Sequence, residues 1–82
     1  WPHGQPIPMQ TDDEGRPVLF VLNEQRFRLL RIEQHWEVDT DWWSADGRVW
    51  RRYVAATTLE GDLVVIFYDV LGEGWFLEKL YD

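Results

Sequence analysis

Cysteine is absent from this chain of 82 residues, and histidine occurs only twice. Without cysteine the chain can form no disulfide, no thiol nucleophile and no zinc site that uses a thiolate. His3 and His35 alone are too few to supply the three or four convergent ligands of a typical metal site. We therefore expect no metal, no cofactor and a fold that is stabilised by packing.

Positive charge is also scarce. Eight Lys and Arg stand against fifteen Asp and Glu, which gives a net charge of −7. This balance repels phosphate chains at long range and disfavours non-specific binding to nucleic acid. The arginines nevertheless gather within residues 26–31 and 48–52, so a local basic patch stays open as an alternative.

Long apolar runs are missing as well. No stretch approaches the roughly 20 apolar residues of a membrane-spanning helix, and the first residues lack the basic and apolar regions of a secretory signal. We expect no membrane association and, by default, a cytoplasmic location. Because the chain does not begin with Met, we expect it to be a segment of a longer protein or to have a trimmed end.

The usual catalytic residue sets do not occur either. The chain has no glycine-rich phosphate loop, and its densest carboxylates, residues 12–14 and Asp39 with Asp41, fall in predicted turns. Asp in a turn commonly accepts hydrogen bonds from backbone amides and stays solvated. We therefore expect that the protein is not an enzyme.

Short apolar runs between turn signals dominate the rest of the sequence. Residues 1–8 carry three of the four prolines and predict an extended arm or linker. Residues 9–82 predict one β domain, with strands at 9–10, 18–22, 26–38, 49–57, 63–68 and 75–81. Five or six short strands joined by turns predict an all-β antiparallel meander that forms a small barrel or a strongly bent sheet.

Two of these predicted strands have unusual patterns of apolar residues. Residues 18–22 are apolar at every position, which predicts a strand that is buried on both faces. In residues 26–38, Leu29, Ile32 and Trp36 have helical spacing, whereas other apolar pairs alternate with one change of parity. A strand with a bulge near Leu29 and Leu30 explains that change, and a short helix stays open as the alternative.

The tryptophans are the most informative residue type. Trp36, Trp50 and Trp75 lie in predicted strands and are expected in the core, because aromatic burial dominates the stability of small domains. Trp42 and Trp43 are adjacent, so in an extended segment their side chains point to opposite faces. At least one of them is then exposed or packs on a partner.

Arg51 and Arg52 lie on opposite faces by the same alternation. An exposed indole beside a guanidinium can form a recognition surface for another protein. Trp42, Trp43, Arg51 and Arg52 are therefore the candidate partner-binding residues. The alternative is that the arginines only form cross-strand ion pairs. The carboxylates considered for these pairs are Glu33, Glu37, Asp62 and Asp69.

The order of aromatic and charged residues in the second half carries a resemblance. Trp42-Trp43 precedes Arg51-Arg52-Tyr53, which precedes residues 61–69 and 74–82. This order resembles a small uncharacterised bacterial β domain family and the tail segment that follows the polymerase-like region in some ImuB-type relatives of Y-family DNA polymerases. The resemblance implies an accessory role without enzymatic activity, near translesion DNA synthesis, and it implies no particular ligand.

The sequence as a whole favours a non-enzymatic β module that binds another protein. The alternative function is binding of single-stranded nucleic acid, in which exposed aromatic rings stack on bases and arginines contact phosphates. Both functions would use the same aromatic and arginine residues, so the sequence leaves the alternative open.

Replacing Trp42 and Trp43 together with Ala is expected to abolish binding of the partner protein. The urea denaturation midpoint should stay nearly unchanged, because the two indoles cannot both enter one core. A pull-down from native lysate, with the unmodified domain as control, measures the loss of binding. Loss of folding in the double variant would instead show that both indoles belong to the core.

Overall fold

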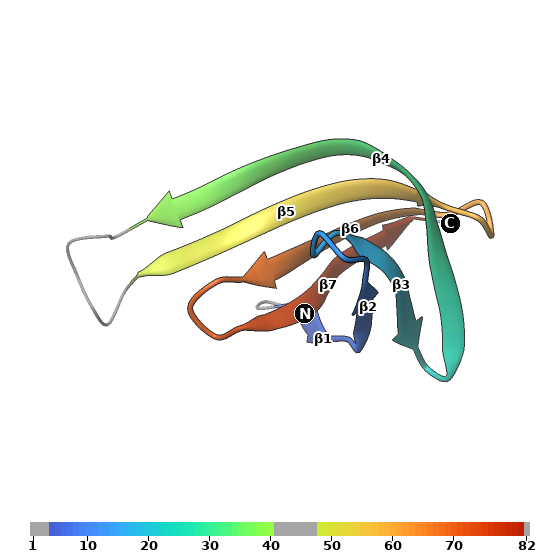
Figure 1. The fold of residues 1–82 in the computed structure, drawn as a ribbon, viewed down its shortest axis with the longest axis horizontal. Coiled ribbons are helices and arrows are strands. Elements are labelled where there is room, and N and C mark those ends of the chain that lie inside the picture. The colour runs from blue at the N-terminus through green and yellow to red at the C-terminus, as the bar shows by residue number, and fades with distance from the viewer. Residues whose placement is uncertain (1–3, 41–47, 82) are drawn as a thin grey trace.

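The computed structural model describes residues 4–40 and 48–81, which form one antiparallel sheet of seven strands (Figure 1). The strands are β1 (Gln5–Pro6), β2 (Met9–Thr11), β3 (Pro17–Leu22), β4 (Gln25–Thr40), β5 (Val49–Thr58), β6 (Leu63–Asp69) and β7 (Gly74–Tyr81). Their order in the sheet is β1-β7-β6-β5-β4-β3-β2. The sheet curls into a half-barrel, which confirms the predicted all-β antiparallel fold, and the described residues contain no helix.

One short segment holds both edges of the curled sheet. β1 pairs with β7, β2 pairs with β3, and only Ile7 and Pro8 separate β1 from β2. The backbone N–H of Ile7 donates to the carbonyl oxygen of Trp75 at 3.1 Å, and that of Val21 donates to Pro8 at 3.3 Å. Residues 5–11 therefore connect β7 to β3, and the sheet closes around its inner face.

Residues 5–8 do not stand apart from the domain as an arm, and β1 is the strand that the sequence did not predict. Ile7 is 6% exposed and belongs to the core. Pro6 is tolerated because β1 is an edge strand, where the missing N–H of proline leaves no neighbour unpaired. Gly4, directly before β1, has a φ of 83°, a conformation that glycine adopts without steric strain.

The core fills the inner face of the half-barrel. Its buried side chains are Ile7, Phe20, Leu22, Phe27, Val54, Ala56, Val64, Ile66 and Leu77. Phe20 and Leu22 belong to the run that was predicted to be buried on both faces, and that prediction is wrong. Leu19 and Val21, which alternate with them, are only partly buried, and Val18, which the register shift with β2 leaves without a partner residue, is 36% exposed.

β4 is a strand of 16 residues, which excludes the short helix considered for residues 26–38. The register with β5 shifts between Leu29 and Arg31 and again between Ile32 and Gln34. The first shift is the predicted bulge at Leu29 and Leu30, and the second was not predicted. Each bulge bends the strand and increases its twist, and Figure 1 shows β4 curving around the sheet.

A row of aromatic rings crosses the outer face of β4, β5, β6 and β7. Trp36, Tyr53, Phe67 and Phe76 are direct cross-strand neighbours. The centroids of successive rings lie 5.2, 5.1 and 5.1 Å apart. Aromatic pairs at this spacing contribute about 0.5–1.5 kcal/mol each beyond the area they bury, so this aromatic row stabilises the sheet from outside.

Trp36 is 39% exposed at the open end of the aromatic row, so the prediction that it lies in the core is wrong. The unpredicted bulge beside Glu33 is the cause, because it places Ile32 opposite Ala56 on the inner face and Trp36 on the outer face. Trp50 and Trp75, also predicted in the core, are only partly buried.

Gly4→Ala is expected to destabilise the domain more than Gly15→Ala. Both glycines have positive φ, which costs alanine about 1–2 kcal/mol. A Cβ on Gly4 would also lie 2.8 Å from Cε2 of Phe67, whereas a Cβ on Gly15 would meet nothing within 4 Å. Overpacking adds roughly 1–3 kcal/mol at Gly4.

Urea denaturation of the two variants measures this difference. Equal losses of stability would contradict the packing of the N-terminal segment on Phe67.

Candidate functional site

Arg51 and Arg52 face opposite sides of the sheet, as the alternation predicts. Nε of Arg52 donates to Oε1 of Glu37 at 3.2 Å on the inner side. The guanidinium carbon of Arg51 lies 4.5 Å from the ring centroid of Phe67 on the outer side. Nη1 of Arg51 also donates to the hydroxyl of Tyr53 at 3.3 Å. Arg51 therefore covers part of the aromatic row.

The other two candidate partner-binding residues, Trp42 and Trp43, lie outside the described residues. A surface that contains one of these indoles can include either Arg51 or Arg52, because the two arginines point to opposite faces. A partner-binding surface formed by Trp42 or Trp43 with Arg51 or Arg52 therefore stays a prediction.

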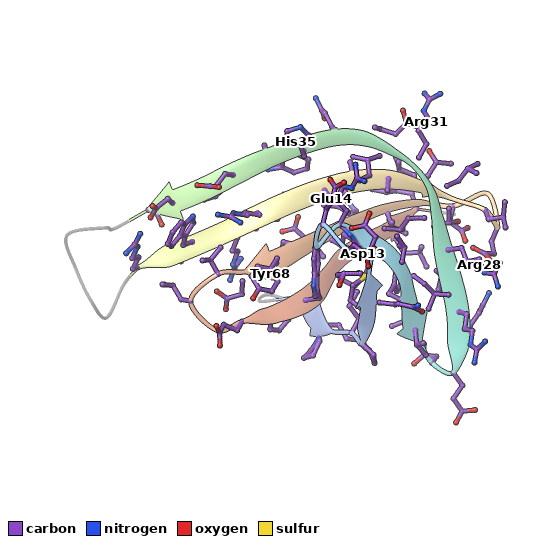
Figure 2. The ribbon with its side chains drawn as sticks, in the orientation of Figure 1. Asp13, Glu14, Arg28, Arg31, His35 and Tyr68 are labelled. Atoms are coloured by element: carbon purple, nitrogen blue, oxygen red, sulfur yellow. The ribbon has the colours of Figure 1, made fainter. Side chains whose placement is uncertain are left out.

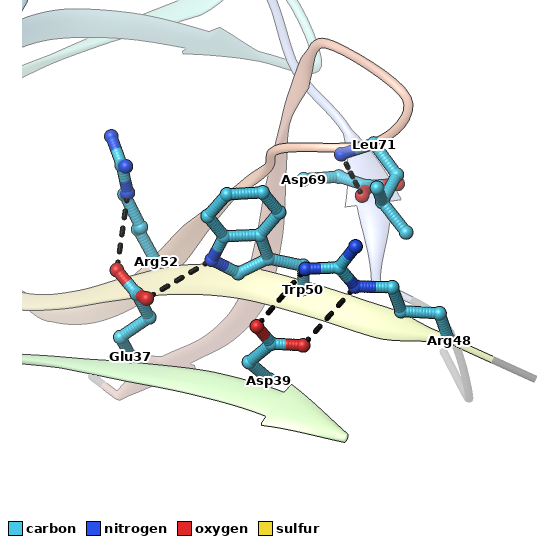
Figure 3. A network of polar contacts seen from close by, with 7 residues as sticks. All are labelled: Glu37, Asp39, Arg48, Trp50, Arg52, Asp69 and Leu71. Carbon is cyan, nitrogen blue, oxygen red and sulfur yellow. Dashed lines mark hydrogen bonds and ion pairs between the residues drawn. The ribbon is translucent and has the colours of Figure 1, made fainter. Parts of the chain in front are cut away.

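A network of polar contacts lies on the inner side of the β4–β5 hairpin, beyond the core (Figure 3). Oε2 of Glu37 accepts a hydrogen bond from Nε1 of Trp50 at 3.0 Å, in addition to the contact with Arg52. Nε and Nη2 of Arg48 donate to the two oxygens of Asp39 at 3.2 and 3.1 Å. The predicted cross-strand ion pair is thus confirmed for Arg52 with Glu37.

The same network positions the indole of Trp50 between two guanidinium groups. The guanidinium carbon of Arg48 lies 4.7 Å from the ring centroid of Trp50, and that of Arg52 lies 5.9 Å from it. Cation–π contacts at exposed sites contribute about 0.5–1 kcal/mol each. Trp50 is therefore held on the inner side by one hydrogen bond and two such contacts.

Arg31 is engaged in a similar way further along β4. Its Nε and Nη2 donate to the two carboxylate oxygens of Glu33 at 3.1 and 2.8 Å. The hydroxyl of Thr57 donates to the same carboxylate at 2.8 Å. The hydrogen bond from Arg31, and next the one from Thr57, lower the pKa of Glu33.

Next to this network the inner face forms a groove of about 670 Å³. The aromatic residues that line it are Trp36, Tyr53, Tyr68 and Trp75, and Figure 2 labels Tyr68 on β6. The wall made by β4 and β5 contains Ile32, His35, Trp36, Glu37, Arg52, Tyr53 and Val54. The wall made by the end of β2, the β2–β3 turn and the start of β3 contains Thr11, Glu14, Gly15, Arg16 and Pro17. His35 is exposed on the sheet surface, as predicted.

Local hydrogen bonds build the wall at the β2–β3 turn. Oδ1 of Asp12 accepts from the backbone N–H groups of Glu14 and Arg16, both at 2.9 Å. Oδ2 of Asp12 accepts from Nε of Arg16 at 3.0 Å. This is the role that the sequence predicted for Asp in this turn. The backbone N–H of Arg16, more than any other group, lowers the pKa of the Asp12 carboxyl.

The opposite wall includes a strand edge. β3 pairs with β4 only at residues 25–28, and β5 pairs with β4 from Leu29 to Thr40. Within residues 4–40 and 48–81, no strand pairs with the second edge of β4 beyond Arg28. The groove therefore opens along an edge whose backbone hydrogen-bonding groups have no partner strand.

The groove combines an aromatic surface with charged walls, an arrangement that can bind a ligand with both apolar and polar groups. Its charged side chains form ion pairs, Arg52 with Glu37 and Arg16 with Asp12 and Glu14. In the part of the chain that the structure describes, no group of three or more His, Asp or Glu side chains could hold a metal ion. The same residues contain no helix that could cross a membrane.

The sequence does not indicate the groove. Its pattern predicts Glu37 as an ion-pair partner, His35 as a surface residue and Trp75 as a core residue, and none of the three as part of a binding site. Tyr68 and Trp75 are cross-strand neighbours with ring centroids 5.3 Å apart. Only the register of β6 and β7 brings these two rings together, and the sequence does not specify that register.

Comparison with known proteins gives no relative, because no protein-family model, no curated protein and no solved structure matches the chain. The resemblance to the ImuB-type tail segments stays a prediction from the sequence.

Acidification is expected to loosen the β2–β3 turn only below pH 3.8, the ordinary pKa of an aspartate side chain. Because the pKa of folded Asp12 is lowered, its ionised carboxylate stabilises the folded turn above pH 3.8. This contribution is lost as the pH falls through the lower value of the folded state. An NMR titration of the backbone amides of Glu14 and Arg16 should therefore show a midpoint below 3.8.

Asp12→Asn is the control, because it removes the charge and keeps one acceptor oxygen. A midpoint above 3.8, or an unchanged titration in this variant, would contradict the assignment.

Proposed function

We propose that the domain is a non-enzymatic module that binds another protein, and that the groove on the inner face receives an extended segment of this partner. The observation that carries the proposal is the groove itself, with Tyr68 and Trp75 among its lining residues and ion pairs on both walls. Its volume of about 670 Å³ lies in the range of roughly 300–1,000 Å³ that is typical of ligand sites.

An extended polypeptide fits the chemistry of this groove. Trp, Tyr and Arg are the residue types that contribute most strongly to protein interfaces, and Trp75, Tyr68 and Arg52 all line the groove. Apolar side chains of a bound segment would pack on the two rings. Its backbone polar groups would lie beside the carboxylates and guanidinium groups of the walls.

The charges argue against the alternative of single-stranded nucleic acid. The net charge of −7 repels phosphates, and four arginines already form ion pairs with carboxylates. These arginines are Arg16, Arg31, Arg48 and Arg52.

The aromatic row offers little for base stacking, because its rings pack on one another. Tyr53 and Phe67, in its middle, are 8% and 1% exposed. Only Trp36, at the end of the row, is substantially exposed.

The sequence resemblance to the ImuB-type tail segments implies that the partner acts near translesion DNA synthesis. A bacterial partner in DNA repair belongs to the proposal on that ground only, and the cytoplasmic location belongs to it as the default expectation from the sequence.

Selection of a random peptide library displayed on phage against the domain tests the proposal. We expect peptides that bind the groove, so a selected peptide should shift the NMR signals of the Trp75 indole and the Ile32 methyl groups. Tyr68→Ala should weaken binding at least about tenfold, as removal of a central aromatic contact does. Leu71→Ala should leave it unchanged, because Leu71 is 50% exposed in the β6–β7 turn and does not line the groove.

Failure to enrich any peptide would contradict the proposal. So would a selected peptide that shifts only the NMR signals of residues outside the groove. Binding of single-stranded oligothymidine at low salt, where such binding is strongest, would favour the nucleic-acid alternative instead.

A further inference from the structure

We infer that the partner segment binds as an added β-strand on the open edge of β4, beside residues 34–40, and that this segment is rich in Lys or Arg. The inference rests on the proposed function and names both the mode of recognition and the chemistry of the partner. Strand addition to an exposed edge is a known way to bind extended peptides, because backbone hydrogen bonds supply affinity and alternate side chains supply specificity.

The pairing of β4 leaves room for such a strand. β3 covers the second edge of β4 only at residues 25–28. Both bulges of β4, at Leu30 and at Glu33, lie before Gln34. Bulges and charged side chains commonly protect a strand edge from accidental pairing, but residues 34–40 pair with β5 without any shift of register. This stretch is therefore regular, and no strand among the described residues pairs with its second edge.

The direction of the backbone groups of β5 follows from one hydrogen bond. The backbone N–H of Val70 donates to the carbonyl oxygen of Trp50 at 2.9 Å, so the backbone of Trp50 faces β6. In an antiparallel pair, successive residues direct their N–H and C=O groups alternately toward one neighbouring strand and the other. The backbone groups of Arg51 and Tyr53 therefore face β4. The bond from the N–H of Leu59 to the carbonyl oxygen of Arg28 on β4 follows the same alternation.

The direction of the backbone groups of β4 follows in turn. Val38 lies opposite Arg51 and Trp36 lies opposite Tyr53, so the N–H and C=O groups of Val38 and Trp36 face β5. The residues between and beside them, which are His35, Glu37 and Asp39, direct their N–H and C=O groups to the open edge. These three residues offer three donors and three acceptors in line.

The same three residues place their side chains on the inner face. His35 lies opposite Val54, a core residue, and Glu37 lies opposite Arg52. His35 and Glu37 also line the groove. A strand added at this edge would therefore direct every second side chain into the groove, where Tyr68 and Trp75 lie.

The charges beside this edge favour a basic segment. The carboxylates of β4 and of the β2–β3 turn are Asp12, Asp13, Glu14, Glu33, Glu37 and Asp39. The arginines that contact them are Arg16, Arg31, Arg48 and Arg52. The carboxylates outnumber these arginines by two, and the whole chain carries −7. The other two arginines of β4, Arg26 and Arg28, lie away from this edge, where β3 pairs with the strand. A second copy of the chain would bring the same negative charge to the edge, whereas a segment with Lys or Arg complements it.

His35→Pro and His35→Ala form the matched pair of variants that tests the inference. Both remove the imidazole, but only proline removes the N–H that faces the open edge. Proline is tolerated there because that N–H does not bond to β5. With a peptide selected on the unmodified domain, His35→Pro should bind roughly tenfold or more weakly than His35→Ala, because both variants lack the imidazole and only His35→Pro lacks the N–H. Equal binding by the two variants would overturn the inference.

A second measurement leaves the protein unmodified and so does not depend on the folding of the proline variant. The backbone amides of the selected peptide are methylated one at a time, and each peptide is titrated against the domain. Strand addition predicts that methylation weakens binding at every second residue, because only alternate N–H groups bond to β4. Equal effects at all positions, or none, would overturn the inference.

The composition of the selected peptides tests the chemistry of the partner. An excess of Lys and Arg supports a basic segment, and an excess of Asp and Glu would overturn it. Light scattering of the domain alone tests for a second copy at the edge. A dimer that His35→Pro converts to a monomer, and His35→Ala does not, would show that a second copy occupies the edge and would overturn the inference of a partner segment. Failure of the proposed function can be distinguished from failure of this inference, because no selected peptide would then shift the NMR signals of Trp75 and Ile32.

Discussion

The site depends on one constraint, which is the unequal pairing of the two edges of β4. β5 pairs with it from Leu29 to Thr40, while β3 pairs with it only at residues 25–28. β3 cannot follow β4 further, because it begins at Pro17, directly after a turn that the carboxylate of Asp12 holds in place. The β4–β5 hairpin therefore extends past the closed part of the half-barrel (Figure 1), and the groove lies between this hairpin and the β2–β3 turn.

The extended hairpin needs support that the core does not give. The core residues of β5, which are Val54 and Ala56, lie toward the far end of the strand. On the outer face, the stacked rings of Trp36 and Tyr53 join the hairpin to β6 through Phe67. On the inner face, the hydrogen bonds from Trp50 and Arg52 to Glu37 join β5 to β4. The wall of the groove is thus held from both sides while its edge stays open.

The sequence predicted most of the fold because turn residues and β-branched runs are local signals. The strand at 26–38 and its bulge near Leu29 followed from one change of parity, and the opposite faces of Arg51 and Arg52 followed from simple alternation. Local signals failed where pairing between distant segments decides the outcome. Residues 5–8 looked unsuited to a sheet because of their prolines, but positions at the edges of the sheet, beside β7 and β3, accommodate them.

The candidate site was less predictable than the fold. Trp36 was assigned to the core because the second bulge, beside Glu33, leaves no mark in the pattern of apolar residues. Tyr68 and Trp75 meet only through the register of β6 and β7. The open edge of β4 is a property of two strands of different length, so no single stretch of sequence indicates it. Trp42 and Trp43, which the sequence favoured, lie outside the described residues.

Amide hydrogen exchange along β4 of the free domain tests the central claim most directly, since it reports which backbone N–H groups have a partner. The open edge predicts slow exchange at Gln34, Trp36 and Val38 and fast exchange at His35, Glu37 and Asp39. Slow exchange at all six amides would show that another strand already covers this edge, and would contradict the account.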